Sequence, residues 1–241
     1  MAVVEQEEAP LEIESGEGQI TERPLGAFTR PHGSGGWRSW LFTVDHKRIG
    51  IMYGAAGLLF FVIGGIYALF MRLQLARPDN SILSAETYNQ VFTMHGVVMI
   101  FLAAIPLGAA FSNYLIPLQI GARDVAFPRL NAFSFWVFLG GGIFLLTSMF
   151  IGGWWENAPD GGWFAYSPNT GVLFSPSKGI DFFAIGLQIT GIASLVGAIN
   201  LIVTVLNMRS PGMTLMKMPV LTWMLFITQM LLLFANVILR L

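Results

Sequence analysis

Hydrophobic residues in this chain gather into long, nearly unbroken stretches, and shorter polar stretches separate them. A helix that crosses a bilayer needs about 20 mainly apolar residues. Five segments meet this length, at residues 49–71, 88–112, 133–152, 182–206 and 220–239. The pattern therefore predicts an all-α fold, an integral membrane helical bundle with about five transmembrane helices.

Composition also favours a membrane protein. Of the 241 residues, 54% are hydrophobic and only 11% are charged, whereas a soluble domain carries about a quarter charged residues. The sequence has no cysteine, which excludes disulfides and thiolate metal sites. A net charge of -1 gives no indication of nucleic acid as a partner, and we expect none.

The first 36 residues differ from the rest of the chain. Seven glutamates lie between Glu5 and Glu22, and a stretch rich in Pro, Gly and Ser closes the segment. This composition predicts a disordered acidic tail over residues 1–36 and an incomplete transmembrane bundle over residues 37–241. Because the tail lacks the basic start and apolar core of a secretory signal, we expect the first helix to direct insertion.

Basic residues predict the orientation, because Lys and Arg are enriched in short loops on the cytoplasmic side. With a cytoplasmic N-terminus, nine of the 13 Lys and Arg residues lie inside and four lie outside. The count favours this topology. It makes residues 113–136 an inner loop with Asp124 beside the membrane interface, and residues 153–181 the longest outer loop.

One histidine, His95, lies inside the second apolar segment, in the run YNQVFTMHGVVMIFLAAIPLGAA. An ionisable group within a membrane helix indicates a functional site, because its burial is costly. A neutral imidazole offers one nitrogen to a metal, such as haem iron, and donates a hydrogen bond from the other. An interhelical hydrogen bond alone is the alternative, and position by itself favours neither.

The neighbour of His95 favours the ligand interpretation. Gly96 has no side chain, so we expect it to leave room for a flat macrocycle beside the imidazole. His95 lies about seven residues from the outer end of its helix, which corresponds to a depth of about 10 Å. This depth suits an electron carrier that is reached from outside.

Two further patterns concern helix packing. Gly50 and Gly54 form a small-xxx-small pair in the first helix, which predicts a close approach of two helix backbones. In the last segment, Gln229 and Asn236 are seven residues apart and therefore share a helix face that would ordinarily be apolar. The sequence does not explain this polar face.

Five stretches resemble one family in their order and spacing. They are WLFTVDHKRIGIMY, TMHGVVMIF, NYLIPLQIGARDVAFPRLNAFSFW, GGWFAYSP and GIASLVGAINLIVTVLNMRSPGM. They resemble the first half of subunit I of the haem-copper oxygen reductases, the cytochrome c oxidase family. The resemblance covers residues 37–223, and it implies the N-terminal part of a twelve-helix membrane fold.

The resemblance implies a cofactor site at the outer side. His95 matches an axial ligand of the low-spin haem, which we expect to be haem a. Arg72 matches an arginine that interacts with a haem substituent, and Trp163 matches a tryptophan near the haem propionates. Without the family, Arg72 would be interpreted as a snorkelling interfacial cation.

The resemblance also implies a proton pathway from the inner side. Asp124 matches the carboxylate at the entrance of the D pathway, with Asn113 and Asn131 beside it. Tyr53, Ser134, Ser194 and Asn200 match polar residues that line this water-filled route. Hydrogen bonding between helices is the alternative for the hydroxyls and amides, and an exposed ion pair with Arg123 or Arg129 is the alternative for Asp124.

The family implies a function that one part of the subunit cannot perform alone. Oxygen reduction there needs several histidines on copper and on two haems, whereas this sequence has a single histidine inside an apolar segment. We therefore expect copper and the high-spin haem only in the complete subunit.

The sequence thus predicts part of a terminal respiratory oxidase in a prokaryotic plasma membrane. The implied partners are subunits II and III, cytochrome c or quinol as electron donor, oxygen and membrane lipids. A truncated non-enzymatic membrane protein, or a half-subunit that needs a second chain, is the alternative. A transporter is less favoured, because only Asp124 suggests a substrate site.

Overall fold

A computed structural model describes residues 36–150 and 158–238 of the chain. The chain divides into two units, Met1–His32 and Gly33–Leu241, and every described residue belongs to the second. The predicted acidic tail therefore lies outside the described residues, apart from Gly36. Trp154, Trp155 and the side chain of Asn236 also lie outside them.

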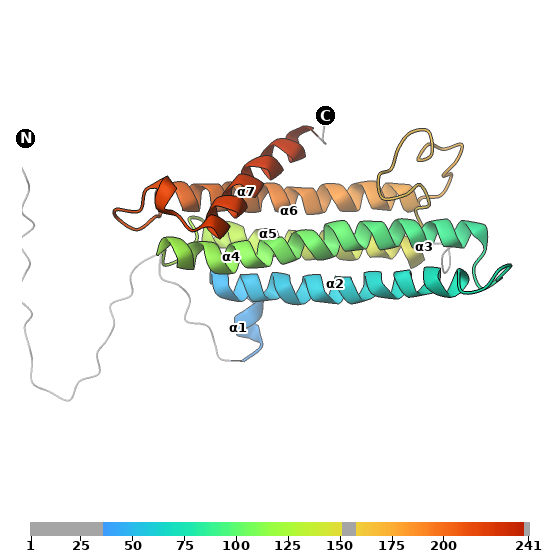
Figure 1. The fold of residues 1–241 in the computed structure, drawn as a ribbon, viewed down its shortest axis with the longest axis horizontal. Helices are drawn as coiled ribbons and strands as arrows, with labels where there is room; N and C mark the ends of the chain where they lie inside the picture. Colours follow the sequence, from blue (N-terminus) through green and yellow to red (C-terminus); the bar gives the residue numbers. More distant parts are fainter. Residues whose placement is uncertain (1–35, 151–157, 239–241) are drawn as a thin grey trace, which may run out of the picture. The chain divides into compact units, whose positions relative to one another are not determined.

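The described residues form helices and contain no strand. Within these residues, seven α-helices are labelled α1 to α7 in Figure 1. They are α1 (Arg38–Leu41), α2 (His46–Gln74), α3 (Ala85–Val97), α4 (Ile105–Ile120), α5 (Pro128–Thr147), α6 (Gly179–Asn207) and α7 (Val220–Ile238). A π-helical stretch, Val98–Ala104, joins α3 to α4, and short 3-10 helices occur at Ser148–Phe150 and Leu215–Lys217.

Four of these helical segments are long and apolar enough to cross a membrane. They are His46–Gln74, Ala85–Ile120, Pro128–Phe150 and Gly179–Asn207, with 29, 36, 23 and 29 residues. The fifth predicted segment forms α7, which is apolar and shorter. The all-α membrane bundle is thus confirmed, and the chain is a multi-pass membrane protein.

The second predicted helix is longer than the sequence suggested, and one predicted loop is wrong. Residues 113–120 continue α4 and residues 128–136 belong to α5, so the connection between these helices is only the turn at residues 121–127. Proline ordinarily interrupts a helix, because it has no N–H and its ring crowds the preceding turn. Here α4 continues through Pro117 and ends at Gly121, whose left-handed φ of 73° terminates the helix.

A second proline lies where the same long helix changes its winding. Pro106 lies close to the end of the π-helical stretch Val98–Ala104 and within the first turn of α4. A proline has no N–H and its ring crowds the preceding turn, and wider π-helical turns are one way in which a helix absorbs such a defect. The 36 residues from Ala85 to Ile120 therefore form one continuous helix.

The helices pack in neighbouring pairs around an apolar core. In Figure 1, α2 runs alongside α3 and α4, α5 runs alongside α6, and α7 crosses α6 obliquely. Tyr53 of α2 contributes an edge-to-face contact with Phe135 of α5, with ring centroids 5.1 Å apart. This packing brings polar residues of several helices toward one another in the interior.

The predicted close approach of two helices is confirmed at Gly50. A Cβ atom there would lie 3.0 Å from the carbonyl oxygen of Ala110 and 3.2 Å from the backbone nitrogen of Tyr114, both in α4. At Gly54 a Cβ would make only an ordinary contact of 3.7 Å with Ala110. Of the predicted pair, Gly50 rather than Gly54 therefore makes the close approach to α4.

Candidate functional site

His95 lies in the last turn of α3, where it is partly buried and contacts α2. Its Nδ1 atom is 2.8 Å from the carbonyl oxygen of Gly64. A carbonyl only accepts, so Nδ1 carries the hydrogen and donates it, which leaves the lone pair on Nε2. Within the described part of the chain, Nε2 has no partner. The interhelical hydrogen bond and an available ligand nitrogen thus coexist in one side chain.

A segment of the connection between α5 and α6 docks on the same turn of α3. The backbone N–H of Gly162 donates to Thr93 Oγ1 at 2.9 Å. Next to it, the Trp163 side chain covers Gly96, where an added Cβ would lie 3.1 Å from both Cβ and Cδ1 of Trp163. The space beside Gly96 is therefore filled by Trp163. The prediction that Gly96 leaves room for a macrocycle is wrong, and Gly96 instead admits the indole.

The two other predicted cofactor residues lie toward the same end of the bundle. Trp163 is 43% exposed beside the turn that carries His95. Arg72 is exposed in the last turn of α2, eight residues beyond Gly64, and this spacing corresponds to about 12 Å along the helix. Both haem-related roles of Arg72 and Trp163 stay predictions, as does the snorkelling alternative for Arg72.

The donor chemistry at His95 fits one axial position of a haem iron. A haem iron takes its equatorial nitrogens from the porphyrin and needs only axial ligands from protein. Nε2 of His95 is such a ligand, and the bond from Nδ1 to Gly64 fixes the orientation of the ring. Within the described residues, no group of three or more His, Cys, Asp or Glu could hold a bare metal ion.

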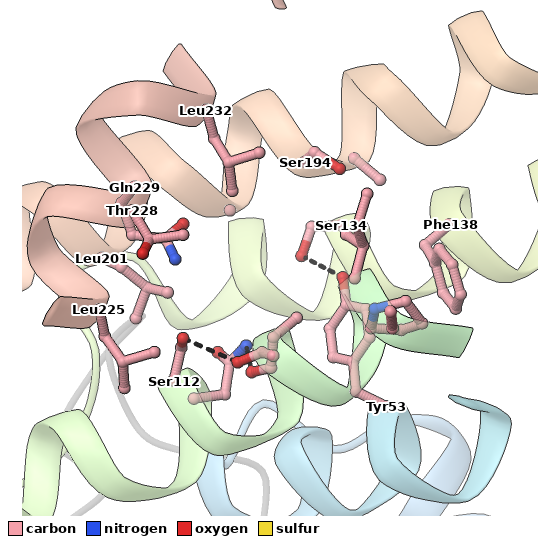
Figure 2. A pocket seen from close by; sticks show the side chains of 18 residues that line it. Tyr53, Ser112, Ser134, Phe138, Ser194, Leu201, Leu225, Thr228, Gln229 and Leu232 are labelled. Atoms are coloured by element: carbon pink, nitrogen blue, oxygen red, sulfur yellow. Dashed lines mark hydrogen bonds between the residues drawn. The ribbon is translucent and has the colours of Figure 1, made fainter. Parts of the chain in front are cut away.

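A cavity of about 300 Å³ lies toward the other end of the bundle and is lined by residues of α2, α4, α5, α6 and α7. Its wall is mostly apolar, with a few polar side chains directed inward (Figure 2). Four predicted pathway residues line it, namely Tyr53, Asn113, Ser134 and Ser194. The structure therefore brings these four together, although they come from four different helices.

Two of these lining residues belong to a short chain of hydrogen bonds. Ser134 Oγ donates to the carbonyl oxygen of Asn131 at 2.8 Å. A hydroxyl has a single hydrogen, so the Tyr53 hydroxyl, at 3.1 Å, donates to Ser134 (Figure 2). Ser194 instead donates to the carbonyl of Thr190 in its own helix, at 3.2 Å.

Two buried amides near the cavity lack partners within the described structure. Asn113 Oδ1 has none, although Asn113 Nδ2 donates to the carbonyl of Ala109 at 2.9 Å. Asn131 is only 1% exposed, and neither atom of its amide has a partner. Buried polar groups are almost always hydrogen-bonded in folded proteins, often to water. These two amides are therefore positions at which ordered water is expected.

Asn200, another predicted pathway residue, does not line the cavity. Its Oδ1 accepts from the backbone N–H of Phe127 at 2.8 Å, and its Nδ2 donates to the carbonyl of Phe127 at 3.3 Å. One helical turn later, Thr204 Oγ1 accepts from the N–H of Ala126 at 2.8 Å. The two side chains hold the turn at residues 121–127 against α6. Sequence analysis missed Thr204, although its spacing from Asn200 indicated a shared helix face.

Asp124 lies in that turn and is buried, with 5% exposure. One carboxylate oxygen accepts from the backbone N–H of Val125 at 2.8 Å. The side chains of Arg123 and Arg129, by contrast, are exposed to solvent. The carboxylate is therefore inside the protein, and the ion pair with Arg123 or Arg129 stays an alternative.

The unexplained polar face of the last segment has a partial explanation. Gln229 of α7 is 7% exposed and lines the cavity together with Thr228 (Figure 2). α7 is held in place by Thr222, whose hydroxyl donates to Gln119 of α4. Gln229 thus lies across the cavity from residues of α4, α5 and α6. The sequence alone did not reveal this arrangement.

These features define a membrane helical bundle, with an imidazole nitrogen that has no partner among the described residues at one end and a largely apolar cavity lined by a few polar side chains toward the other. The family model described as "Cytochrome C and Quinol oxidase polypeptide I" matches residues 48–241. The chain belongs to this family, as the resemblance in the sequence had predicted.

Three curated relatives illustrate the similarity. Cytochrome c oxidase subunit 1 of Bacillus subtilis (strain 168) is 54% identical over 213 residues, 88% of this chain and 33% of the relative. A probable cytochrome c oxidase subunit 1-alpha of Streptomyces coelicolor is 48% identical over 198 residues, 81% of this chain and 33% of the relative. Quinol oxidase subunit 1 of Bacillus subtilis (strain 168) is 46% identical over 199 residues, 83% of this chain and 30% of the relative. The chain thus spans about one third of the length of these relatives.

Proposed function

We propose that this chain is part of subunit I of a terminal respiratory oxidase, which passes electrons through haem to oxygen and couples this to proton uptake and pumping. The observation that carries the proposal is the geometry of His95. Its ring is oriented by Gly64 of a neighbouring helix, and Nε2 is left without a partner among the described residues. Membership of the oxidase family gives this nitrogen a suitable occupant.

His95 would hold the low-spin haem, which we propose to be haem a, as one of its axial ligands. The family implies haem and copper as cofactors, and the haem, when bound, would supply reversible one-electron transfer. Gly64 keeps the imidazole in the Nδ1–H tautomer, so Nε2 is always the ligating atom. Arg72 and Trp163 would contact the haem substituents and propionates from the outer side.

Asp124 would collect protons at the entrance of the D pathway. The carboxylate is buried in a turn that Asn200 and Thr204 hold in place. Beyond it, Asn113 and Asn131 offer unpartnered amide atoms, and the Tyr53 and Ser134 hydroxyls and Ser194 line the cavity. Amides and hydroxyls that ring a cavity hold water molecules in a file, along which protons move. In this scheme Asn200 acts by positioning the entrance turn rather than by contacting the water.

The remaining components would come from other parts of the complete subunit and from its partners. The sequence has three histidines, His32, His46 and His95, and only His95 is proposed as a haem ligand. We therefore place copper and the high-spin haem in the complete subunit. Names such as "subunit 1" imply further subunits in the relatives, and we propose subunits II and III as partners. The electron donor would be cytochrome c or quinol, since relatives of both kinds match.

The membrane would be the plasma membrane of a prokaryote, with the N-terminus on the cytoplasmic side. This orientation places the Asp124 turn inside and the His95 end outside. It agrees with the distribution of Lys and Arg residues.

The test is replacement of His95 by Ala in the assembled oxidase complex. Loss of the ligand nitrogen should abolish the low-spin haem absorption, which visible spectroscopy of purified membranes measures. His32→Ala is the matched control, because the sequence places His32 in the acidic tail, and it should retain the spectrum. An unchanged low-spin haem signal in His95→Ala would refute the proposal.

A further inference from the structure

His46, the first residue of α2, is a buried histidine that the proposed function does not use. It is 2% exposed, and its Nδ1 atom lies 2.9 Å from the backbone carbonyl oxygen of Asn113 in α4. Because the carbonyl can only accept, Nδ1 is the donor. The bond links α2 to α4 across 67 positions of the sequence.

The Asn113 carbonyl needs this donor because of Pro117. In an α-helix, the carbonyl of residue 113 accepts from the N–H of residue 117. Pro117 lies inside α4 and has no N–H, so this partner is missing. A buried carbonyl without a partner is costly. His46 replaces the missing intrahelical bond with a bond from another helix.

The two helices are also fixed at close range beside this bond. One turn after His46, Gly50 packs so closely on α4 that a Cβ would lie 3.0 Å from the carbonyl oxygen of Ala110. Ala110 precedes Asn113 by three residues, so the contact and the hydrogen bond are on neighbouring parts of α4. The position of Asn113 relative to α2 is therefore defined at two points.

The side chain of Asn113 depends on this backbone position. Asn113 lines the cavity, and its Oδ1 is buried with no partner among the described residues. Tyr53, which lines the same cavity, belongs to α2 as His46 does. A shift of α4 relative to α2 would therefore change the distance between Asn113 and the Tyr53–Ser134 pair.

We propose that His46 is a positioning residue for the proton pathway, which it serves by bonding the Asn113 carbonyl left free by Pro117. This inference rests on the proposed function, because the Asn113 side chain has a role only if protons pass through the cavity. His46 itself carries no proton in this scheme. It fixes the place at which Asn113 offers its amide oxygen to water.

The test uses three replacements in the assembled oxidase complex, with the rate of proton uptake and the low-spin haem spectrum as readouts. His46→Leu removes the donor and should slow uptake by about tenfold, because small misplacements in a reaction path have large effects on rate. The low-spin haem spectrum should stay unchanged. His46→Gln retains an N–H donor of similar reach and should recover most of the rate.

The decisive experiment repeats His46→Leu in a complex that also carries Pro117→Ala. The second change restores an N–H at position 117, so the Asn113 carbonyl regains its intrahelical partner. The effect of His46→Leu should then fall to about two- to threefold relative to Pro117→Ala alone. If His46→Leu does not assemble by itself, Pro117→Ala should restore assembly. An undiminished effect in this background, or no restored assembly, would overturn the proposal.

Asp124→Asn separates failure of this inference from failure of the proposed function. If Asp124→Asn slows proton uptake and His46→Leu does not, the role of His46 is refuted and the pathway stands. If Asp124→Asn leaves proton uptake unchanged, the pathway itself is refuted, and the positioning role of His46 is refuted with it.

Discussion

The two ends of the bundle differ in the number and arrangement of their buried polar groups. At the His95 end, one imidazole makes one hydrogen bond to α2, and its other nitrogen has no partner among the residues that the structure describes. Toward the other end, polar side chains from five helices surround a cavity, and buried amide atoms lack partners within the described structure. A metal needs a single, firmly oriented atom, whereas a water file needs several groups spaced along a path.

The difference also concerns which residues can be replaced. The His95 site depends on one atom, so its loss should be complete. The proposed proton pathway is divided among many groups, so the effect of losing one lining hydroxyl or amide should be partial. The buried carboxylate of Asp124 is the exception, because no other acid is proposed for the entrance.

The largest expected effect within the proton pathway is that of Asp124→Asn. Asparagine retains an oxygen that can accept from the Val125 N–H, so the turn should keep its fold. It cannot take up a proton, and proton uptake during turnover should fall by about a hundredfold. Rapid measurement of proton uptake in the assembled complex checks this.

Asp45→Asn is the matched control for Asp124→Asn. Asp45 caps the start of α2 by accepting from the N–H of Lys47, and asparagine caps a helix equally well. Proton uptake should therefore be unchanged. An equal decrease in both variants would show that the effect is not specific to the entrance.

Asn200→Ala should have an intermediate effect, and it should reduce stability as well as rate. The change leaves the N–H of Phe127 without its acceptor, which costs about 1–3 kcal/mol if that group stays buried, whereas the carbonyl of Phe127 keeps the N–H of Asn131 as a donor. The turn that carries Asp124 should loosen, and proteolysis within residues 121–127 should accelerate. The midpoint of thermal denaturation, followed by loss of haem absorption, measures the loss of stability.

Ser194→Ala provides the comparison for Asn200→Ala. Ser194 bonds to a carbonyl in its own helix, and such bonds contribute little to helix stability. Its replacement should change the denaturation midpoint less than Asn200→Ala does. If Ser194→Ala proves the more destabilising change, Asn200 does not support the turn.

The smallest effect is expected from Gly96→Ala at the other end. The new Cβ would lie 3.1 Å from Trp163, so the indole must move slightly. Such overpacking costs about 1–3 kcal/mol. The low-spin haem absorption band should shift without loss of haem, which visible spectroscopy detects. Gly65→Ala is the control, because nothing lies within 4 Å of a Cβ at that position, and it should leave the band in place.

Much of the fold could be predicted because it depends on local patterns. The apolar stretches predicted the helical bundle, and the isolated His95 predicted a ligand or an interhelical bond, both of which its geometry supports. The resemblance predicted the family. These inferences need only residue types and their spacing.

The wrong predictions concern positions where a residue from another segment of the chain alters the local structure. The apolar pattern ended the second helix at residue 112, but α4 continues to Ile120, and His46 from another helix bonds the Asn113 carbonyl that Pro117 leaves free. Gly96 indicated an open space, but Trp163 from a loop fills it. Gln229 had no evident purpose until packing placed it at the cavity. Each of these depends on which segments meet in three dimensions, and spacing along one segment does not contain that information.

The continuous helix from Ala85 to Ile120 also limits how this sequence can evolve. His95 and Asn113 are 18 residues apart on it, which in a regular α-helix is about 27 Å and about five whole turns. The π-helical stretch Val98–Ala104 lies between them and alters this phase. Deleting or inserting one residue there would rotate one end against the other by about 100°. Insertions and deletions should therefore be tolerated in the loops and rejected between positions 95 and 113.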